Sequence, residues 1–393
     1  MKAGWKTVKL GDVTKEFIVP QRDKPKNLCG DIPWCRIEDI DGIYMSSSKS
    51  GKGVTAKDVK EMPLRIFPAG TVIVSCSADL GRCAIVSKPL ITNQTFLGIV
   101  PDETIDAKYL YYLLRSRAEQ LNSMATGATI KYLSRDKFSS LEIPLPPLAE
   151  QKRIAALLDE AFVGIDTLSS NAKTRSSEAL YVFEQERDSF FSNPDNKYTE
   201  TTISDITTRL QYGTSEKSAS TGRYVVLRMG NIQDGEIDYE DLKYTSSQEV
   251  IDQYSLKPGD VLFNRTNSPQ WVGKSAIYRG EMPAVFAGYN IKIHTIADKV
   301  DSEFLTFFLN SDRAMSFGRA TFISSVNQAN INAEKLRSYR LPLPPLREQK
   351  AIADRLGQIR KMSRELAAIY QNSLAQSHHL KAATLRSAFN GTL

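Results

Sequence analysis

The chain has 393 residues, of which 41% are hydrophobic and 24% charged, a composition typical of globular proteins and unlike that of disordered or fibrous chains. Basic residues (51) outnumber acidic ones (45), and the net charge of +6 permits a nucleic-acid partner without requiring one. No apolar run approaches the ~18 residues that span a bilayer, and the first ten residues contain no apolar leader, so we expect a cytoplasmic protein without a membrane partner.

Residues 1–142 predict a globule of mixed α and β structure. Short β-like runs such as Thr71–Ser75 alternate with Gly, Pro and Asn, and residues 109–114 form one aromatic helical stretch. The cysteines all lie in this part, but their spacing misses the tight pairs of structural zinc sites, and the histidines are remote. We therefore expect no metal site at Cys29, Cys35, Cys76 and Cys83.

Residues 143–195 predict a proline hinge followed by a long helix. The pair Pro146-Pro147 imposes an extended approach and prevents a helix from running through it. From about residue 148 to 190, apolar residues then recur every three or four positions, in a stripe narrow enough for a coiled-coil seam. The stripe consists of Ile154, Leu158, Ala161, Ile165, Leu168, Ala172 and Ala179.

Residues 196–340 predict a second α+β globule, and residues 341–393 a second hinge and helix. Here the hinge is Pro344-Pro345, and the helix should cover about 346–390 with a stripe of Ile352, Leu356, Ile359, Leu366 and Tyr370. Each helix could pack on its own globule. A helix of this length measures roughly 60 Å at ~1.5 Å per residue, however, which is longer than such a globule is wide. We therefore expect the two helices to pair with each other, antiparallel.

An internal repeat underlies this organisation. Residues 143–160 align with residues 341–358 at an offset of 198, with eleven of eighteen positions identical. Weaker matches precede them in the same order, for example residues 36–40 with 228–232 and residues 109–114 with 304–309. Such a period indicates two duplicated domains related by a pseudo-two-fold axis. Two diverged globules on a helical spacer would suit recognition of two DNA half-sites, or a scaffold that holds two protein partners apart.

The sequence lacks the catalytic motifs of the common enzyme classes. Gly273-Lys274-Ser275 resembles the end of a phosphate-binding loop, but the glycine required five positions earlier is Ser268. There is no Gly-x-Gly-x-x-Gly turn, no Gly-x-Ser-x-Gly elbow, no His-Glu-x-x-His and no Asn/Asp-Pro-Pro-Tyr/Phe motif of amino-methyltransferases. We therefore expect no catalytic residues in this chain.

One motif occurs twice in the chain, each time after an α+β globule and at the start of a long helix: Pro-Leu-Pro-Pro-Leu-x-Glu-Gln-Lys-x-Ile-Ala. In this arrangement the chain resembles the specificity (S) subunits of type I restriction–modification systems. The resemblance covers the whole chain. It implies two target recognition domains that each read one half of a bipartite, asymmetric sequence in double-stranded DNA, joined by an antiparallel coiled coil.

The resemblance also implies the division of labour in the complex. The chain itself would be non-catalytic and bind no cofactor. Its partners would be two adenine methyltransferase (M) subunits, which use S-adenosylmethionine to methylate adenine N6. Restriction/translocase (R) subunits, which use ATP and Mg²⁺, would complete the assembly.

One pair of loops is the first candidate for reading DNA. The loop 75–82 occupies the place of the loop 264–274, within a shared strand–loop–Gly-Arg/Lys frame but with unlike residues inside. Arginine can fork onto guanine and asparagine can pair with adenine. A solvated hairpin is the alternative. The candidate DNA-contacting residues are Ser75, Ser77, Arg82, Asn264, Arg265, Asn267 and Lys274.

A second pair of segments, 126–132 and 324–330, is rich in small, hydroxyl and amide side chains that suit phosphates and base edges. The alternative is a polar helix cap with Ser134 and Asn332 as N-caps. Arg36 and Arg228 recur in both copies, so we expect them to contact the DNA backbone or to stabilise the fold. The candidates are Thr129, Lys131, Tyr132, Ser324, Asn327 and Gln328, with Asn93 and Gln94 as a third, short polar element.

The start of each long helix is nearly identical in the two copies, which suggests a shared role. That role could be the docking of one methyltransferase subunit per copy. Alternatively, Glu and Gln satisfy first-turn amides and the helix dipole. The docking candidates are Pro146, Pro147, Glu150, Gln151, Pro344, Pro345, Glu348 and Gln349.

Overall fold

The structure, a computed structural model, describes residues 4–21, 25, 27–77, 79–127, 131–193, 197–325 and 328–390. The chain divides into two compact units: unit 1 holds Met1–Ala172 and Asn372–Leu393, and unit 2 holds Lys173–Gln371. Two long helices, α5 (Leu148–Ser192) and α10 (Leu346–Phe389), each contribute one part to each unit.

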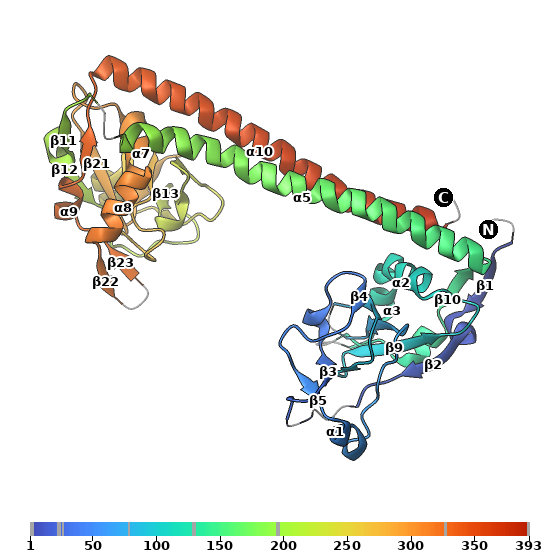
Figure 1. Cartoon of the computed structure of the whole chain (residues 1–393). Helices are drawn as coiled ribbons and strands as arrows, with labels where there is room; N and C mark the ends of the chain where they lie inside the picture. The colour runs from blue at the N-terminus through green and yellow to red at the C-terminus, as the bar shows by residue number, and fades with distance from the viewer. Residues whose placement is uncertain are drawn as a thin grey trace. The chain divides into compact units, whose positions relative to one another are not determined.

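Unit 1 is built on a mixed sheet in the order β2-β9-β6-β7-β4, with a second sheet in the order β5-β3-β8. The strand β1 pairs with β10, so the unit's first strand lies beside the strand that leads into α5 (Figure 1). The strands are β1 (Lys6–Lys9), β2 (Thr14–Ile18), β3 (Ile32–Cys35), β4 (Tyr44–Met45), β5 (Gly53–Val54), β6 (Val72–Ser75), β7 (Cys83–Val86), β8 (Ile91–Thr92), β9 (Phe96–Pro101) and β10 (Glu142–Leu145). The helices are α1 (Ala56–Glu61), α2 (Ala107–Ser116), α3 (Ala118–Met124) and α4 (Arg135–Ser139).

Unit 2 repeats the plan with different loops. Its strands are β11 (Glu200–Thr202), β12 (Thr207–Tyr212), β13 (Tyr224–Leu227), β14 (Ile232–Gln233), β15 (Glu236–Ile237), β16 (Tyr244–Thr245), β17 (Val261–Asn264), β18 (Thr266–Asn267), β19 (Ser275–Ile277), β20 (Ala284–Phe286), β21 (Asn290–Thr295), β22 (Ile323–Ser325), β23 (Gln328–Asn330) and β24 (Arg340–Pro342). Its helices are α6 (Gln248–Tyr254), α7 (Ser302–Leu309), α8 (Asp312–Thr321) and α9 (Ala333–Arg337).

The two globules share one topology. The order β12-β21-β17-β19 in unit 2 repeats β2-β9-β6-β7 in unit 1, and β13 between β16 and β20 repeats β3 between β5 and β8. In both copies the first strand pairs antiparallel with the strand before the long helix, β1 with β10 and β11 with β24. The prediction of a duplicated α+β fold is therefore confirmed.

An aromatic helix joins each sheet to the long helices. In unit 1, α2 is capped by Asp106, and its Tyr109 ring lies 5.3 Å from that of Phe389 at the end of α10. In unit 2, α7 is capped by Asp301, and its Phe304 ring lies 5.3 Å from that of Phe191 at the end of α5. Each globule is thus held by the helix that follows it and by the last turns of the other helix.

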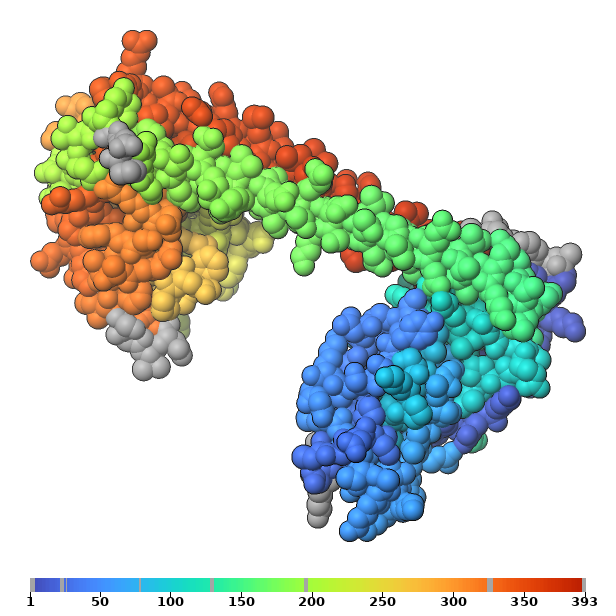
Figure 2. Space-filling model, in the orientation of Figure 1, coloured from blue at the N-terminus to red at the C-terminus, as the bar shows by residue number. Residues whose placement is uncertain are grey.

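Within each unit the parts of α5 and α10 run antiparallel. In unit 1, Asp166 of α5 pairs with Lys381 of α10. In unit 2, Ser176 Oγ donates to the Ala367 carbonyl at 3.3 Å, and Glu186 pairs with Arg355 at 3.1 Å. In unit 2, contacts further along α5 are made with residues earlier in α10, and the two helices lie side by side there (Figure 2). The predicted bounds, 148–190 and 346–390, agree with the helices to within a few residues.

The predicted apolar stripe is wrong at two positions. Leu168 is 60% exposed and Leu366 is 43% exposed, whereas Ala172, Ser176, Ser363 and Ala367 are buried. Small side chains allow the two helix backbones to approach closely, and this close approach leaves no room between them for leucine. Among the described residues, no helix is long and apolar enough to cross a bilayer.

Candidate nucleic-acid interface

In unit 1 the two loop segments chosen from the sequence lie side by side. Ser77, in the loop after β6, forms an antiparallel β-bridge with Tyr132, and the Leu133 amide donates to the Cys76 carbonyl at 2.8 Å. Tyr132 is also bridged to Thr126. Segments about 55 residues apart in sequence therefore form one surface.

Unit 2 brings the equivalent segments together more extensively. β18, inside the loop 264–274, pairs with β23, so that Thr266 faces Asn330 and Asn267 faces Ala329. β23 also pairs with β22, and the Ile331 amide donates to the Arg265 carbonyl at 2.9 Å. In both copies the structure thus joins the two segments that the sequence had suggested separately.

Asn264 cannot be a DNA-contacting residue in this structure, because its side chain is fully buried. Its Nδ2 donates to the Thr266 and Tyr289 carbonyls at 3.2 and 3.1 Å, and its Oδ1 accepts from Asn267 Nδ2 at 3.0 Å. The buried amide is therefore hydrogen-bonded within the loop, as buried polar side chains generally are. Asn264 therefore stabilises the loop conformation, and the side chain of Asn267 points towards Asn264.

Arg265 also serves the loop itself. Its guanidinium lies 4.9 Å from the Tyr212 ring centroid, donates to Asn330 Oδ1 at 3.1 Å and donates to the Gly288 carbonyl at 3.3 Å. Two of the guanidinium nitrogens therefore donate hydrogen bonds within the globule, so the pair of N–H groups that could bind guanine is directed inward. Arg265 ties the loop 264–274 to β23. Neither contact was predicted from the sequence, because Tyr212 and Asn330 are both more than fifty residues away from Arg265 along the chain.

Lys274 closes the loop beside an exposed ring. Its Nζ lies 4.0 Å from the Trp271 ring centroid and donates to Gln233 Oε1 at 2.8 Å. Burial lowers the pKa of Lys274 below its usual value. Trp271 is 46% exposed and was not among the predicted residues. A tryptophan in an otherwise polar loop was the available signal in the sequence, since large aromatic rings are seldom left in water without a partner.

In unit 1, as in unit 2, some of the candidate residues in the loop are buried and others are exposed. Ser75 is fully buried, with its hydroxyl donating to the Ser77 carbonyl, so it supports the loop and cannot contact DNA in this structure. Arg82 remains exposed, although it donates to the Ile40 carbonyl at 3.1 Å and pairs with Asp79 at 3.4 Å.

Asn93 and Gln94 line a polar cavity of about 290 Å³ in unit 1. Arg36 and Thr92 line it too, at the carboxyl ends of the parallel strands β3 and β8. Thr92 Oγ1 and Arg36 Nε are buried and have no hydrogen-bond partner among the described residues. Asn93 Oδ1 accepts from Thr95 Oγ1 at 2.6 Å, while Gln94 is exposed. Polar groups at this cavity are thus unsatisfied within the globule.

The remaining candidates fall into two groups. Lys131, Tyr132 and Gln328 are exposed on the joined surfaces. Thr129 and Asn327 lie outside the described residues, as does the side chain of Ser324. The exposed members that remain for contact with a ligand are Ser77 in part, Arg82, Gln94, Lys131, Tyr132 and Gln328.

The hinge glutamines are internal anchors. Gln151 is fully buried; its Oε1 accepts from the Asp106 amide at 2.8 Å, and its Nε2 donates to the Thr104 and Pro146 carbonyls, both at 2.8 Å. Gln349 repeats this set with the Asp301 amide and the Lys299 and Pro344 carbonyls. A side chain with no accessible surface cannot dock a partner, so the docking assignment of both glutamines is corrected to a structural one.

The other hinge residues surround these anchors. Pro146 and Pro344 are buried, while Pro147 and Pro345 are exposed. Glu150 pairs with Arg153 at 2.6 Å, and Glu348 accepts from the Tyr198 hydroxyl at 2.7 Å, which raises the pKa of Tyr198. Pro147 therefore remains exposed at the start of α5, with Glu150 partly exposed beside it, and Pro345 and Glu348 remain exposed at the start of α10.

Comparison with known proteins agrees with this architecture. Residues 2–174 and 196–372 each match the family model of the type I restriction modification DNA specificity domain. The EcoKI specificity subunit of Escherichia coli K12 is 25% identical over 364 residues, which cover 86% of this chain and 77% of that protein. The MjaIX specificity subunit of Methanocaldococcus jannaschii is 37% identical over 150 residues, 37% of this chain and 34% of that protein.

Solved structures share the fold. A chain from a structure of complex assembly and conformational transition in a type I restriction–modification system superposes with a TM-score of 0.81 at 20% identity, covering 100% of this chain and 99% of the other. The HsdS subunit of Thermoanaerobacter tengcongensis gives a TM-score of 0.62 at 19% identity, covering 100% and 98%. With two matched domains that together span most of its length, the chain belongs to the family of type I restriction–modification DNA specificity subunits.

Proposed function

We propose that this chain reads a bipartite, asymmetric sequence in double-stranded DNA, one half-site per globule, without catalysing a reaction itself. The observation that carries the proposal is the convergence of the same two segments in both units, on one framework and with unlike exposed residues. Two readers of different sequences need a common framework and different side chains at its surface.

Partner docking is the second part of the proposal. Two methyltransferase subunits would bind the chain, and restriction subunits would join through them. In unit 2, Met362 and Leu366 lie one helical turn apart on α10 and are 68% and 43% exposed, so they form an apolar patch on the surface of the helix. Within unit 2, this apolar patch and the exposed hinge residues Pro345 and Glu348 are the surface of α10 that we propose for a protein partner.

The reaction chemistry is assigned to the partners. S-adenosylmethionine would be bound by the methyltransferase subunits, and ATP and Mg²⁺ by the restriction subunits. The described residues of this chain contain no cluster of His, Cys, Asp and Glu suited to a metal ion.

The first prediction follows from this division of labour. The purified chain is expected to transfer no methyl group to DNA, and to make an adenine methyltransferase subunit sequence-specific when the two are mixed. The measurement is incorporation of labelled methyl groups into duplex DNA, with the partner alone as control. Methyl transfer by the chain alone, or identical sites with and without it, would contradict the proposal.

A second prediction separates residues that contact bases from residues that position the loop. Gln328→Ala should relax discrimination at one or two adjacent base pairs of one half-site, by about 1–3 kcal/mol per lost base contact. Arg265→Ala should weaken recognition across that whole half-site, because the guanidinium holds β23 against the loop 264–274. Sequencing of methylated sites measures both effects.

The matched control for these variants lies in unit 1. Lys131→Ala should leave the half-site affected by Gln328→Ala unchanged and alter only the other. Equal weakening for all sequences would mean that these side chains contact phosphates rather than bases.

A further inference from the structure

The contact between each globule and the long helix that follows it, here called the joint, can be compared position by position. Gln151 and Gln349 make the same three hydrogen bonds, including one from the amide of the helix cap, Asp106 or Asp301. This match fixes the correspondence of the two copies. Lys108 and Tyr112 of α2 correspond to Glu303 and Phe307 of α7, and Asp159 and Phe162 of α5 correspond to Gly357 and Arg360 of α10.

In unit 1 the globule supplies the cation and the long helix the anion. Lys108 Nζ lies 2.6 Å from Asp159 Oδ2, and the Tyr112 hydroxyl donates to Asp159 Oδ1 at 2.6 Å. The Tyr112 ring also packs edge-on against Phe162, with 5.5 Å between centroids. The charged pair is about two-thirds buried, so it interacts in a partly dehydrated environment.

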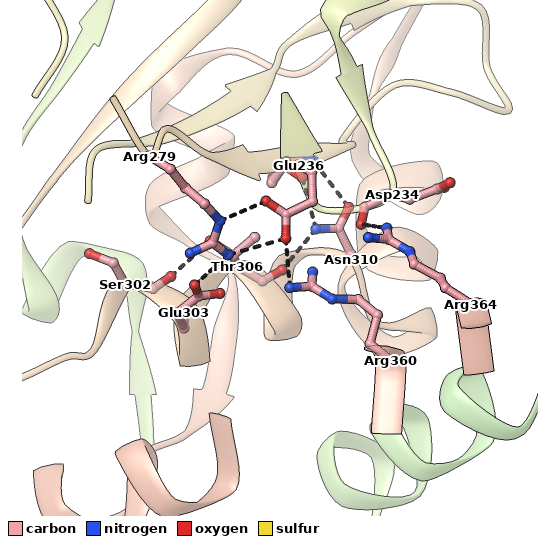
Figure 3. Close-up of polar contacts among 10 residues, drawn as sticks. Asp234, Glu236, Arg279, Ser302, Glu303, Thr306, Asn310, Arg360 and Arg364 are labelled. Carbon is pink, nitrogen blue, oxygen red and sulfur yellow. Dashed lines mark hydrogen bonds and ion pairs between the residues drawn. The ribbon is translucent and has the colours of Figure 1, made fainter. Parts of the chain in front are cut away.

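In unit 2 the polarity is reversed (Figure 3). Arg360 of the long helix is 11% exposed and lies 2.6 Å from Glu236 Oε1. Arg279 bridges the two carboxylates of the globule, 2.9 Å from Glu236 and 2.5 Å from Glu303. The Arg360 guanidinium lies 4.9 Å from the Phe307 ring centroid, where unit 1 has its Tyr112–Phe162 contact. The globule is therefore net acidic here, and the helix is basic.

The residues at these four pairs of equivalent positions differ between the two copies in a correlated way. Tyrosine is replaced by phenylalanine where the carboxylate that accepts its hydroxyl is replaced by glycine, and lysine is replaced by glutamate where the helix gains arginine. Gly357 lines a cavity of about 380 Å³ together with Glu303, Arg279 and Arg360, and apart from its own stretch of helix no atom of the described residues lies within 4 Å of a Cβ built on it. Space for a carboxylate therefore exists at this position, although the joint of unit 2 does not use it.

A globule placed on the other helix would meet the wrong charges. Lys108 would face Arg360 with no acceptor at Gly357, and the Tyr112 hydroxyl would lose its partner. In the opposite exchange, Glu303 would face Asp159, and Glu236 would meet Phe162 in place of Arg360, its ion-pair partner. Like charges brought together and partly desolvated destabilise a contact, and a buried charge that loses its partner does so strongly.

We propose that the two joints are keyed by opposite polarity, so that each long helix accepts its own recognition globule and rejects the other. Lys108 and Asp159 in unit 1, and Glu303, Glu236 and Arg360 in unit 2, are then positioning residues. They determine which globule occupies which position in the chain. The keying concerns folding alone, and its test needs neither DNA nor a partner, so it stands or falls separately from the proposed function.

The first test uses the intact chain. Lys108→Asp and Asp159→Lys should each lower the thermal unfolding midpoint of unit 1 by roughly 4 °C or more, since each brings like charges together. The double variant restores an opposite pair and should regain most of this loss. A double variant as unstable as the sum of the two single ones would overturn the pairing on which the key depends.

The second test moves a globule. In a chimera, residues 196–340 are replaced by residues 1–142, so that the first globule precedes the second helix. Adding Gly357→Asp and Arg360→Phe, which reproduce the helix side of the unit 1 joint, should raise the unfolding midpoint of the chimera or allow it to fold. The same two substitutions in the native chain should lower the midpoint, because they set three carboxylates against Arg279.

The sign of the effect decides the outcome. Glycine-to-aspartate in a helix changes backbone propensity in both proteins alike, so propensity alone would shift both midpoints in the same direction. Opposite shifts are the expected result. Shifts of the same sign, or a chimera that the two substitutions neither stabilise nor allow to fold, would show that the joints are not keyed.

Discussion

Replacing Gln349 by methionine is expected to lower the free energy of unfolding of unit 2 by at least about 3 kcal/mol, at about 1–3 kcal/mol for each of the three backbone groups left unpaired. Methionine is close to glutamine in size, so packing is kept. The Asp301 amide and the Lys299 and Pro344 carbonyls would nevertheless lose the partner that the fully buried Gln349 side chain provides.

Urea unfolding of the full chain, with hydrogen exchange at residues 299–306, measures this loss. Gln151→Met should produce the corresponding loss in unit 1, so the two variants should affect different transitions. Glu348→Ala is the control on the same turn; Glu348 is exposed and accepts from Tyr198, and its loss should change stability little. An unchanged transition in Gln349→Met would mean that the three backbone groups find other partners.

Lengthening both long helices by four residues is expected to lengthen the gap between the two half-sites by about one or two base pairs. Four residues add about 6 Å to a helix, and duplex DNA rises about 3.4 Å per base pair. The insertions belong after Ser176 in α5 and after Ala367 in α10, because these residues contact each other in unit 2. Both half-sequences should stay the same, since the globules are untouched.

Mapping methylated sites in cells that express the variant with its methyltransferase partner measures the gap. An insertion in one helix alone is the control, because it shifts the seam of that helix against its partner and should abolish activity. An active variant of both helices that keeps the original gap would show that helix length does not set the spacing.

Local physics made the hinges and helices predictable. Two consecutive prolines stop a helix wherever they stand, and a stripe at three- to four-residue spacing identifies the helix that follows. The duplicated strand–loop–glycine frame likewise located both loop segments, because a repeat reveals which parts of a chain occupy equivalent places. These features depend on neighbouring residues or on the alignment of the copies.

Burial of individual polar side chains was not predictable in the same way. Asn264 and Gln349 are residue types that serve DNA contact, partner docking and internal hydrogen bonding equally well, and only the surrounding backbone decides between these roles. The seam of α5 and α10 shows the same limit: Leu168 appeared more suitable than Ser176, but close helix approach favours the smaller side chain. Such outcomes depend on contacts far apart in sequence.

The pairing of β11 with β24 has a consequence for the entropy of the chain. The end of α5 and the start of α10 belong to the same unit, and between them the chain passes through β11, residues 203–339 and β24. Because Glu200 lies opposite Pro342, the ends of that long excursion are hydrogen-bonded neighbours. The entropy cost of bringing the two helices together is therefore that of a short connection, whatever the length of chain between β11 and β24. Insertions and deletions in the recognition loops therefore add almost nothing to the loop-closure entropy of the helices, so those loops can change in length while the helix pair keeps its stability.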